Sequence, residues 1–399
     1  MFIRRLCFLL ITAACFAWSA PRFDSQLVFP LEHWHNHSSS VVELPGGDLF
    51  VVWYNGSGER TADDVKLEGA RWSKKTGKWS GRFPIADVAN FPDCNPIVWI
   101  DPQQRLWLFW PTIVANEWHT SILQYRIFAE YPQAEKPVKW QDGGIVLFEP
   151  KNFEARVKAV VEPMLASATE DRVRNYLKEV VTRAGDKYFR RMGWMPRTHP
   201  IALPSGRYIL PLYSDGYDFS VVAYSDDQGK TWHGSEPQLG WGAVQPSIVS
   251  QKDGTLVSWF RDNGPAPKRV LRSESRDNGV SWTVAADTDI PNSGTSVEVI
   301  ALQSGEWLMV NNDTERGRHS LVAWISGDEG RTWKWKRHIE LDERAEKAGS
   351  FHYPSVIQAA DGTIHLAYSL FLNHIPQGQP RKSIKHAAFN VEWVKESAR

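Results

Sequence analysis

The sequence predicts an all-β protein, a six-bladed β-propeller with a helical insertion, and three observations support this fold class. A short pattern, S-x-D-x-G-x-[ST]-W, occurs three times in the second half of the chain. A wider pattern of paired apolar strands occurs six times, and repeats at a period of roughly 50 residues indicate one supersecondary unit used many times. One interval between units is about twice as long as the others and carries residues at helical spacing.

The short pattern predicts a hairpin turn. Its copies run from Ser225 to Trp232, from Ser275 to Trp282 and from Ser326 to Trp333. Asp and Ser side chains can hydrogen-bond the turn backbone, Gly takes the position with positive φ, and Trp packs under the turn. We therefore expect these turns to be structural fasteners between the last two strands of a unit, at blade edges.

The six units predict six blades of four antiparallel strands, each beginning with the strand that lines the central channel. Residues that enter these first strands should converge on one rim of the channel. In chain order they are His37 with Ser38, Asn95, His199, Gln245, Ser296 and Tyr353. A polar and aromatic rim predicts one binding site there, although such side chains could also bond only to one another inside the channel.

The long interval lies between the second and third units, at about residues 151–192, and is rich in Ala, Glu, Lys, Arg, Val and Leu. Its apolar residues recur at helical spacing, which predicts about two helices on one face of the propeller. Pro163 is expected to break or kink this run. The helices could form a lid over the site or an inert packed decoration at the edge.

Composition limits the function classes. The 399 residues carry no net formal charge, which argues against a general nucleic-acid or anionic-membrane binder. The 20 tryptophans suit sugar stacking, but many belong to the repeat itself. His33, His35 and His37 alternate at strand spacing, yet without a carboxylate or cysteine partner they are a weak metal signal. The sequence indicates no metal and no cofactor.

The N-terminus predicts a secretory signal over residues 1–20, followed by one propeller domain over residues 21–399. Arg4 and Arg5 precede an apolar run that ends at Trp18, which is too short for a membrane span. We therefore expect a secreted or periplasmic protein, with a lipoprotein signal at Cys15 as an alternative. Cleavage would leave Cys94 as the one cysteine, so no internal disulfide could form.

These residues resemble the sialidase (neuraminidase) superfamily, whose members carry such turns, called Asp boxes, on six-bladed propellers. The segments HNHSSSVVELPGGDL, FPDCNP, RTHP, VQPS and FHYPS are similar to bacterial BNR-repeat, sialidase-like proteins. The resemblance implies three arginines that clamp a substrate carboxylate, a tyrosine nucleophile activated by a glutamate, and an aspartate as general acid and base.

Residue by residue, the resemblance implies that Tyr353 is the family tyrosine and Arg261 the second arginine. Arg318 fits the third arginine, with Arg316 as its rival. Asp63 or Asp64, on the loop after the second strand of the first unit, would be the acid and base.

Two positions depart from the family pattern. His37 stands where the first arginine is expected, and Gln245 stands where the activating glutamate is expected. An amide cannot take a proton from a phenol whose ordinary pKa is about 10. Cleavage of sialic acid by the family mechanism is therefore not expected.

The sequence thus predicts an exo-acting glycoside hydrolase for an acidic or polyhydroxylated glycan terminus, with carbohydrate as its partner. A uronate lyase that uses His and Tyr, and a carbohydrate-binding propeller without catalysis, are the alternatives. Tyr353, His37, Asp63 and Asp64 are the candidate catalytic residues. The candidate substrate-binding residues are Arg60, Asn95, Arg197, His199, Gln245, Arg261 and Arg318.

Overall fold

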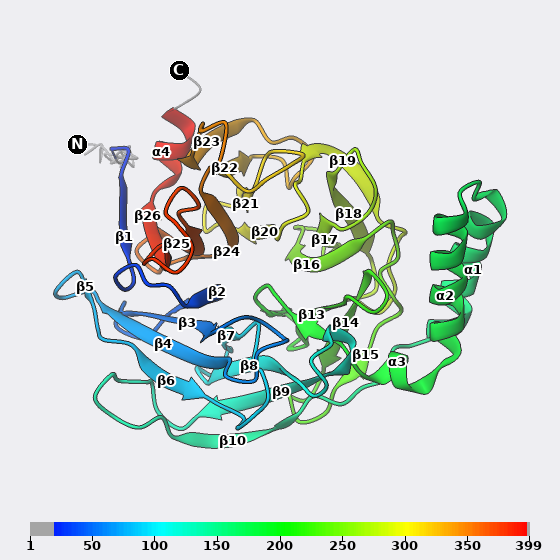
Figure 1. Ribbon diagram of the computed structural model, residues 1–399, viewed down its shortest axis with the longest axis horizontal. Coiled ribbons are helices and arrows are strands. Elements are labelled where there is room, and N and C mark those ends of the chain that lie inside the picture. The colour runs from blue at the N-terminus through cyan, green and yellow to red at the C-terminus, as the bar shows by residue number, and fades with distance from the viewer. Residues whose placement is uncertain (1–19, 397–399) are drawn as a thin grey trace, which may run out of the picture.

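Six antiparallel sheets surround a central axis, which confirms the six-bladed β-propeller (Figure 1). The computed structural model describes residues 20–396. The predicted signal segment lies outside the described residues except for its last position. None of the helices within 20–396 is long and apolar enough to cross a membrane.

The strands follow the predicted order, with the inner strand of each blade first in the chain. Blade 1 contains β2 (His35–Glu43), β3 (Leu49–Gly56), β4 (Lys66–Ser73), β5 (Lys78–Trp79) and β6 (Phe83–Ala86). Blade 2 contains β7 (Ile97–Ile100), β8 (Leu106–Ile113), β9 (Ser121–Phe128) and β10 (Trp140–Ile145). Blade 3 contains β11 (Met195–Pro196), β12 (Ile201–Ala202), β13 (Tyr208–Ser214), β14 (Phe219–Ser225) and β15 (His233–Gly234).

The second half of the ring repeats this order. Blade 4 contains β16 (Ala243–Ser250), β17 (Leu256–Asp262), β18 (Arg269–Ser275) and β19 (Ala286–Pro291). Blade 5 contains β20 (Glu298–Ala301), β21 (Trp307–Asn311), β22 (Ser320–Ser326) and β23 (Trp335–Leu341). Blade 6 contains β24 (Ser350–Gln358), β25 (Ile364–Phe371) and β26 (Lys382–Phe389), and the helix α4 (Val391–Glu396) follows it.

The two ends of the chain close the ring. The outer strand of blade 6 is β1 (Phe23–Leu27), which pairs antiparallel with β26 from Phe23 opposite Phe389 to Leu27 opposite Lys385. This pairing covers an edge strand that would otherwise present unpaired backbone groups. The repeat pattern did not predict it, because β1 precedes the first complete unit.

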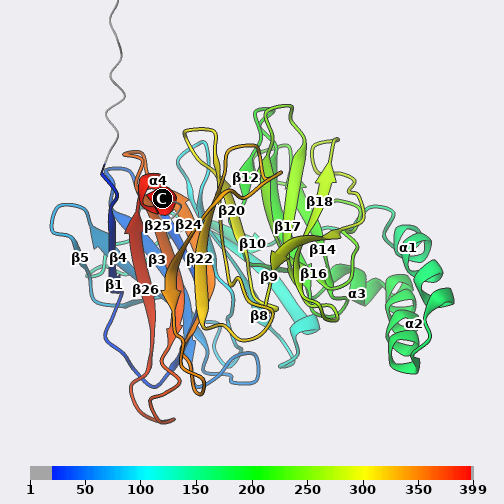
Figure 2. The ribbon, with the colours of Figure 1, turned by 90° about the horizontal axis from the view of Figure 1, so that it is seen from above.

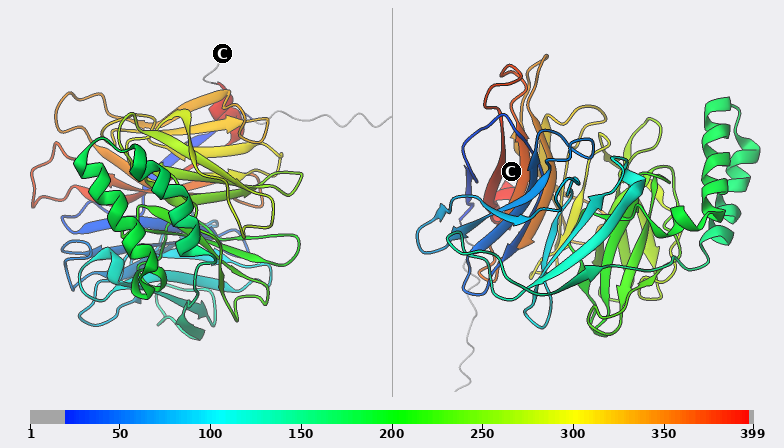
Figure 3. Two further views of the ribbon diagram at one scale, coloured as in Figure 1. Left: turned by 90° about the vertical axis from the view of Figure 1, so that its right-hand side faces the viewer. Right: turned by 60° about the horizontal axis from the view of Figure 1, so that its bottom comes forward.

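The insertion between blades 2 and 3 forms the helices α1 (Phe153–Ser167), α2 (Asp171–Gly185) and α3 (Lys187–Arg191). They stand beside the ring, at its outer edge, and not over the central opening (Figures 1 and 2). The buried side chains of α1 and α2 pack against one another and join the core of blade 3. The expectation of helices on one face was therefore wrong, whereas the alternative of a packed decoration at the edge is what the structure shows (Figure 3). Pro163 does not break α1, which continues for four more residues to Ser167.

The three Asp-box turns fold as predicted. In the first, the Ser225 hydroxyl donates to Asp227 (2.8 Å) and accepts from the Gly229 N–H (2.8 Å). The same bonds recur in the other two copies, and each glycine has a positive φ. Each turn joins the third and fourth strands of its blade, so it lies away from the inner strands. These turns act as fasteners.

The Asp-box turn of blade 5 permits a direct test of packing between blades. Gly330 has a φ of +78°, and a Cβ there would lie 2.7 Å from the Trp259 ring and 3.0 Å from the Trp307 ring. Gly254 has a similar φ of +88° but no atom within 4 Å of such a Cβ. We expect G330A to lower the free energy of unfolding by roughly 1–3 kcal/mol more than G254A, because only G330A overpacks the junction. Urea denaturation measures both, and equal losses would contradict this account.

Candidate functional site

Four non-glycine residues at the entrance of the inner strands have left-handed backbone conformations. They are Ser38 (φ 56°), Asn95 (φ 40°), Gln245 (φ 54°) and Tyr353 (φ 57°). In three blades the residue lies within a register shift between the inner strand and its neighbour. Such bulges redirect side chains, and strained backbone of this kind concentrates at functional sites. All four belong to the residues predicted to share the rim, whereas His37, His199 and Ser296 of that set have no positive φ.

Tyr353 is the centre of the group gathered there, which we call the Tyr353 cluster: His37, Arg197, Gln245, Arg261, Arg318, His352 and Tyr353. Its hydroxyl oxygen accepts a hydrogen bond from Arg261 Nη1 (3.1 Å) and from Gln245 Nε2 (3.2 Å). The His37 ring stacks on the Tyr353 ring with their centroids 4.2 Å apart. Residues from blades 1, 4 and 6 therefore meet at one phenol.

Arg197 supports this phenol from within the protein. Its guanidinium carbon lies 4.8 Å from the centroid of the Tyr353 ring, and Nη2 donates to the Pro354 carbonyl (2.9 Å). The residue is 0% exposed. A guanidinium that is closed off from solvent cannot clamp an incoming carboxylate, so the predicted substrate-binding role of Arg197 is replaced by a supporting one.

Arg318, and not its rival Arg316, belongs to the cluster. Arg318 lies 5.7 Å from the centroid of the Tyr353 ring and donates from Nη1 to His352 Nδ1 (2.9 Å), whereas Arg316 is exposed. Arg261 and Arg318 are both half-buried, unlike the fully buried Arg197. These two arginines can receive an anionic group, since guanidinium matches carboxylate geometry.

The two histidines of the cluster are neutral. Burial, together with the neighbouring His352, holds the pKa of His37 well below its usual range. Burial and the Arg318 guanidinium do the same to the pKa of His352. His352 Nδ1 accepts from Arg318, which requires that nitrogen to be unprotonated.

Several buried polar atoms of the cluster have no hydrogen-bond partner among the residues in the described part of the chain. They are Nε and Nη1 of Arg197, Nε of Arg261, Oε1 of Gln245 and Nε2 of His352. Buried polar atoms in folded proteins are almost always bonded, to ordered water or a ligand where not to protein. These atoms give the interior of the cluster hydrogen-bonding capacity that its own side chains do not use.

The loop after β3 supplies a carboxylate that the sequence did not single out. Glu59 Oε1 accepts from the Tyr54 hydroxyl (2.9 Å) and lies 3.0 Å from His35 Nε2. Burial alone would raise the pKa of Glu59, but the bonds from His35 and Tyr54 hold it below its ordinary value. Tyr54 in turn packs edge-on against His37 at 5.6 Å between centroids.

The predicted catalytic aspartates and the predicted substrate-binding arginine of the same loop make other contacts. Asp63 accepts from Asn116 Nδ2 (2.8 Å), and Asp64 accepts from the backbone and hydroxyl of Ser57, which closes a local turn. Within residues 20–396, neither aspartate hydrogen-bonds to the Tyr353 cluster. Arg60 lies over the Trp118 ring at 5.5 Å and pairs with Glu117 at 3.8 Å.

A second carboxylate follows β13. Asp215 comes two residues after Tyr213, whose hydroxyl accepts from Asn95 Nδ2 (3.2 Å). Asp215 is exposed, and the charge of Arg261 acts on it. Sequence reasoning missed Tyr213 and Asp215, although both stand where the second strand of a blade returns to the rim.

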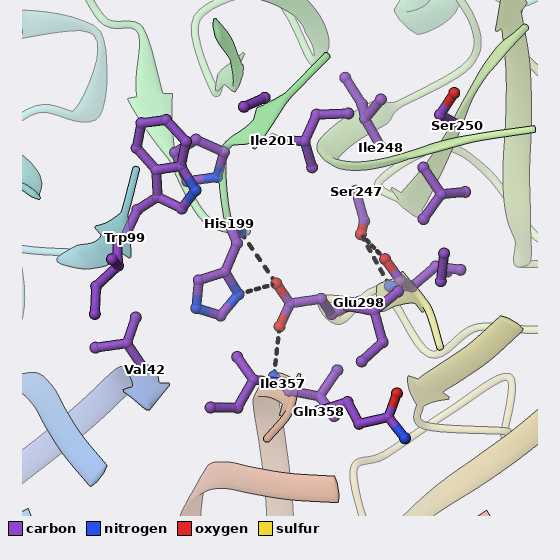
Figure 4. Close-up of a pocket in the computed structure, with 18 of the residues that line it drawn as sticks. Val42, Trp99, His199, Ile201, Ser247, Ile248, Ser250, Glu298, Ile357 and Gln358 are labelled. Atoms are coloured by element: carbon purple, nitrogen blue, oxygen red, sulfur yellow. Dashed lines mark hydrogen bonds and ion pairs between the residues drawn. The ribbon is translucent and has the colours of Figure 1, made fainter. Parts of the chain in front are cut away.

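His199 is not at this rim. It lines a cavity of about 660 Å³ at the other end of the inner strands, with Val42, Trp99 and Glu298 (Figure 4). Glu298 Oε1 accepts from His199 Nδ1 (2.7 Å), and His199 Nε2 donates to the Val41 carbonyl (2.8 Å). Burial alone would lower the pKa of His199, but Glu298 raises it above its ordinary value. The predicted substrate contact of His199 is replaced by a buried ion pair.

The histidines near the N-terminus do not assemble a metal site in the part of the chain that the structure describes. No three His, Cys, Asp or Glu side chains gather there in a way that could hold an ion. His35 and His37 are ring neighbours, 5.5 Å apart between centroids, and each bonds to a different residue.

Comparison with known proteins agrees with this architecture. The model of the BNR repeat-like domain matches residues 137–366, which is more than half of the chain. A sialidase of Micromonospora viridifaciens is 26% identical over 185 residues, 44% of this chain and 26% of that protein. The match thus spans about a quarter of that relative's length.

Solved structures share the fold. A leech intramolecular trans-sialidase superposes with a TM-score of 0.66 and 14% identity, over 94% of this chain and 71% of that one. A protein of unknown function from Dyadobacter fermentans superposes with a TM-score of 0.65 and 14% identity, over 92% and 97%. At these identities the likeness concerns the fold.

The neutral histidines predict a pH-dependent stability. Below a pH of about 6.5 the unfolded chain protonates both histidines, whereas the folded protein keeps them neutral, so the unfolded state binds more protons. The contribution of the two neutral histidines to the free energy of unfolding is therefore fully present above this pH. It decreases as the pH falls, by at most about 1.4 kcal/mol per pH unit for each histidine. We expect H352Q, whose amide oxygen can still accept from Arg318, to reduce this slope between pH 5 and 6.5. Urea denaturation across this range measures it, and an unchanged slope would mean that His352 is protonated in the folded protein.

Proposed function

Because the chain belongs to the BNR repeat-like domain family, we propose that it is a glycoside hydrolase that removes an acidic or polyhydroxylated sugar from the end of a glycan. The sialidase-like fold supports the reaction class. We further propose that it acts outside the cytoplasm, as its N-terminal segment suggests.

The observation that carries the proposal is the set of cationic and polar groups around the Tyr353 hydroxyl. Arg261 touches the hydroxyl, and Arg318 lies over the same ring. Both residues are only half-buried, and two guanidinium groups at one phenol favour an anion such as a sugar carboxylate. Sialic acids and uronic acids carry such a group, whereas neutral sugars would leave the two cations unpaired.

The environment of Tyr353 supports a reaction other than the family mechanism. Gln245 donates to its hydroxyl, and no carboxylate within the described residues hydrogen-bonds to it. An amide cannot accept the phenolic proton as a glutamate would. We therefore expect simple aryl sialosides to be poor substrates, and the donors around the hydroxyl to stabilise charge that develops on the bound sugar.

One observation favours a second candidate, a uronate lyase. Neutral His37 and His352 flank Tyr353, and a neutral imidazole can accept the proton at C5 of a uronate. Arg261 and Arg318 would neutralise the carboxylate, which acidifies that carbon. The leaving oxygen would take a proton from Tyr353, and a C4–C5 double bond would remain.

The product separates these functions. We expect the full chain, incubated with a panel of uronate- and sialate-terminated glycans, to release a monosaccharide without any rise in ultraviolet absorbance. A rise from the unsaturated uronate would identify a lyase. Binding of a glycan without any product would identify a carbohydrate-binding propeller and refute the hydrolase.

Arg316 provides a matched control for the substitution of Arg318. We expect R318A to raise KM for the acidic glycan about tenfold or more, because it removes one charge-assisted contact. R316A should leave KM unchanged, since that side chain is exposed and outside the cluster. Steady-state kinetics measures both, and an unchanged KM for R318A would mean that Arg318 does not bind the carboxylate.

The Y353F substitution removes the hydroxyl group of Tyr353 and keeps the aromatic ring. We expect Y353F to lower kcat/KM about 100-fold while the thermal unfolding midpoint stays within a few degrees, since the ring keeps its contacts with His37 and Arg197. Wild-type turnover by Y353F would remove the hydroxyl from the reaction.

A further inference from the structure

We propose that Ser369 is a positioning residue that holds the proton of His37 on Nε2, so that His37 presents a neutral hydrogen-bond donor, and not a base, to the acidic sugar. Arg318 imposes the same tautomer on His352. The inference rests on the proposed function only for the kind of ligand, because the tautomers follow from hydrogen bonds within the protein.

The tautomer of His352 follows from one hydrogen bond. Arg318 Nη1 lies 2.9 Å from His352 Nδ1, and a guanidinium group can only donate. His352 Nδ1 is therefore the acceptor and carries no hydrogen. Since an imidazole carries at least one proton in water, this proton is on Nε2 of His352.

The tautomer of His37 follows from the contacts of one buried hydroxyl. Ser369 Oγ accepts from the Ser38 N–H (3.2 Å) and lies 2.8 Å from His37 Nδ1. If the imidazole donated the second bond, the hydroxyl hydrogen of Ser369 would have no acceptor among the described residues. Ser369 is 0% exposed, and a buried donor without a partner is costly. Ser369 is therefore the donor and His37 Nδ1 the acceptor, which leaves the proton of His37 on Nε2.

Ser369 also fixes how the His37 ring is presented. The ring stacks on Tyr353 with 4.2 Å between centroids, which sets its plane, and the bond to Ser369 sets its rotation within that plane. Ser369 belongs to β25 of blade 6, and its hydroxyl also holds the N–H of the left-handed Ser38 in blade 1. One hydroxyl therefore fixes the backbone at the rim and the direction of His37 Nε2.

Nε2 of His37 is available to a ligand. It hydrogen-bonds to no residue within 20–396, and it is not among the buried polar atoms that lack a partner, so it is not closed off from solvent. The groups beside it are donors as well. Arg261 Nη1 and Gln245 Nε2 donate at the Tyr353 hydroxyl, and the Arg318 guanidinium lies over the same ring. Donors at one phenol match the carboxylate and hydroxyl oxygens of an acidic sugar.

The tautomers decide which chemistry the two histidines can perform. Each Nδ1 already accepts a hydrogen bond and each Nε2 carries the proton, so neither ring has an unused lone pair. Neither ring can take the proton from C5 of a uronate in this state, which favours hydrolysis over elimination. His37 instead adds a neutral donor at the position where the resemblance to sialidases implies an arginine.

The experiment reads the tautomers directly, by nuclear magnetic resonance of the full chain with isotopically labelled histidine. Long-range proton–nitrogen correlations distinguish the protonated from the unprotonated ring nitrogen, and H37F and H352F assign the two signals. We expect the proton on Nε2 in both rings of the wild type. S369A should lose this single form at His37, because Nδ1 then has no donor.

Ser383 provides a matched control for Ser369. It is also a buried serine of blade 6, in β26, but its hydroxyl donates to the Phe29 carbonyl (2.7 Å). S383A should therefore keep the wild-type signals of His37. Thermal unfolding checks that all variants fold.

The donor role is tested by titration of the same samples with glucuronate and with N-acetylneuraminate, and glucose is the neutral control. We expect at least one acidic sugar to shift the His37 Nε2–H signal, and glucose to leave it unchanged. H37F keeps an aromatic ring on Tyr353 but has no N–H, so it should raise the Kd of that sugar about tenfold. S369A should raise the Kd as well, and S383A should not.

The outcomes separate the inference from the proposed function. A proton on Nδ1 of His37, a wild-type His37 signal in S369A, an unchanged Kd in H37F, or no binding of either acidic sugar overturns the inference. Each of these leaves the release of a monosaccharide by the wild type to be judged on its own product. An unsaturated product from the wild type, or no product, overturns the proposed function, whereas the tautomers are still decided by the spectra.

Discussion

The site depends on four residues with a left-handed backbone conformation, each of which lies at the start of the inner strand of its blade. A regular strand would alternate its side chains between the two faces of the blade, so a rim residue would point at a neighbouring sheet. The extra residue at Ser38, Gln245 and Tyr353 turns the backbone, which directs these side chains towards the axis. The energy of this conformation has to be supplied by the surrounding ring, and the six blades closed by β1 supply it.

Blades 3 and 5 have no left-handed residue at the start of the inner strand, and their side chains show what this conformation achieves in the other four blades. In blade 3 the inner strand is broken into β11 and β12, and His199 between them turns down the channel to Glu298 of blade 5. Glu298 Oε2 also accepts from the Val356 N–H of blade 6 (2.7 Å). One buried carboxylate therefore links three inner strands, and the Val41 carbonyl adds blade 1. The channel has a structural end with this ion pair and a chemical end with Tyr353.

The sequence predicted the repeated elements of the fold, but it could not predict which residues of different blades lie opposite one another across the central axis. Turn chemistry is local, so three Asp boxes and six strand pairs were enough for the blades, their order and the convergence of Tyr353, Gln245 and Arg261. Ring closure by β1 and the edge position of the helices depend on contacts between distant segments. His199 was misplaced because a residue before proline looks the same in sequence whether its backbone is extended or left-handed.

The carboxylates were missed for a geometric reason. In an antiparallel pair, the end of the second strand lies opposite the beginning of the first, so both reach the same rim. The register makes this plain: His37 lies opposite Tyr54, Val244 opposite Arg261, and Met195 opposite Tyr213. Glu59 and Asp215 follow two of these second strands closely. A reading of first strands alone therefore finds the phenol and its neighbours, while the carboxylates of Glu59 and Asp215 come from the segments that follow the strands returning to the rim.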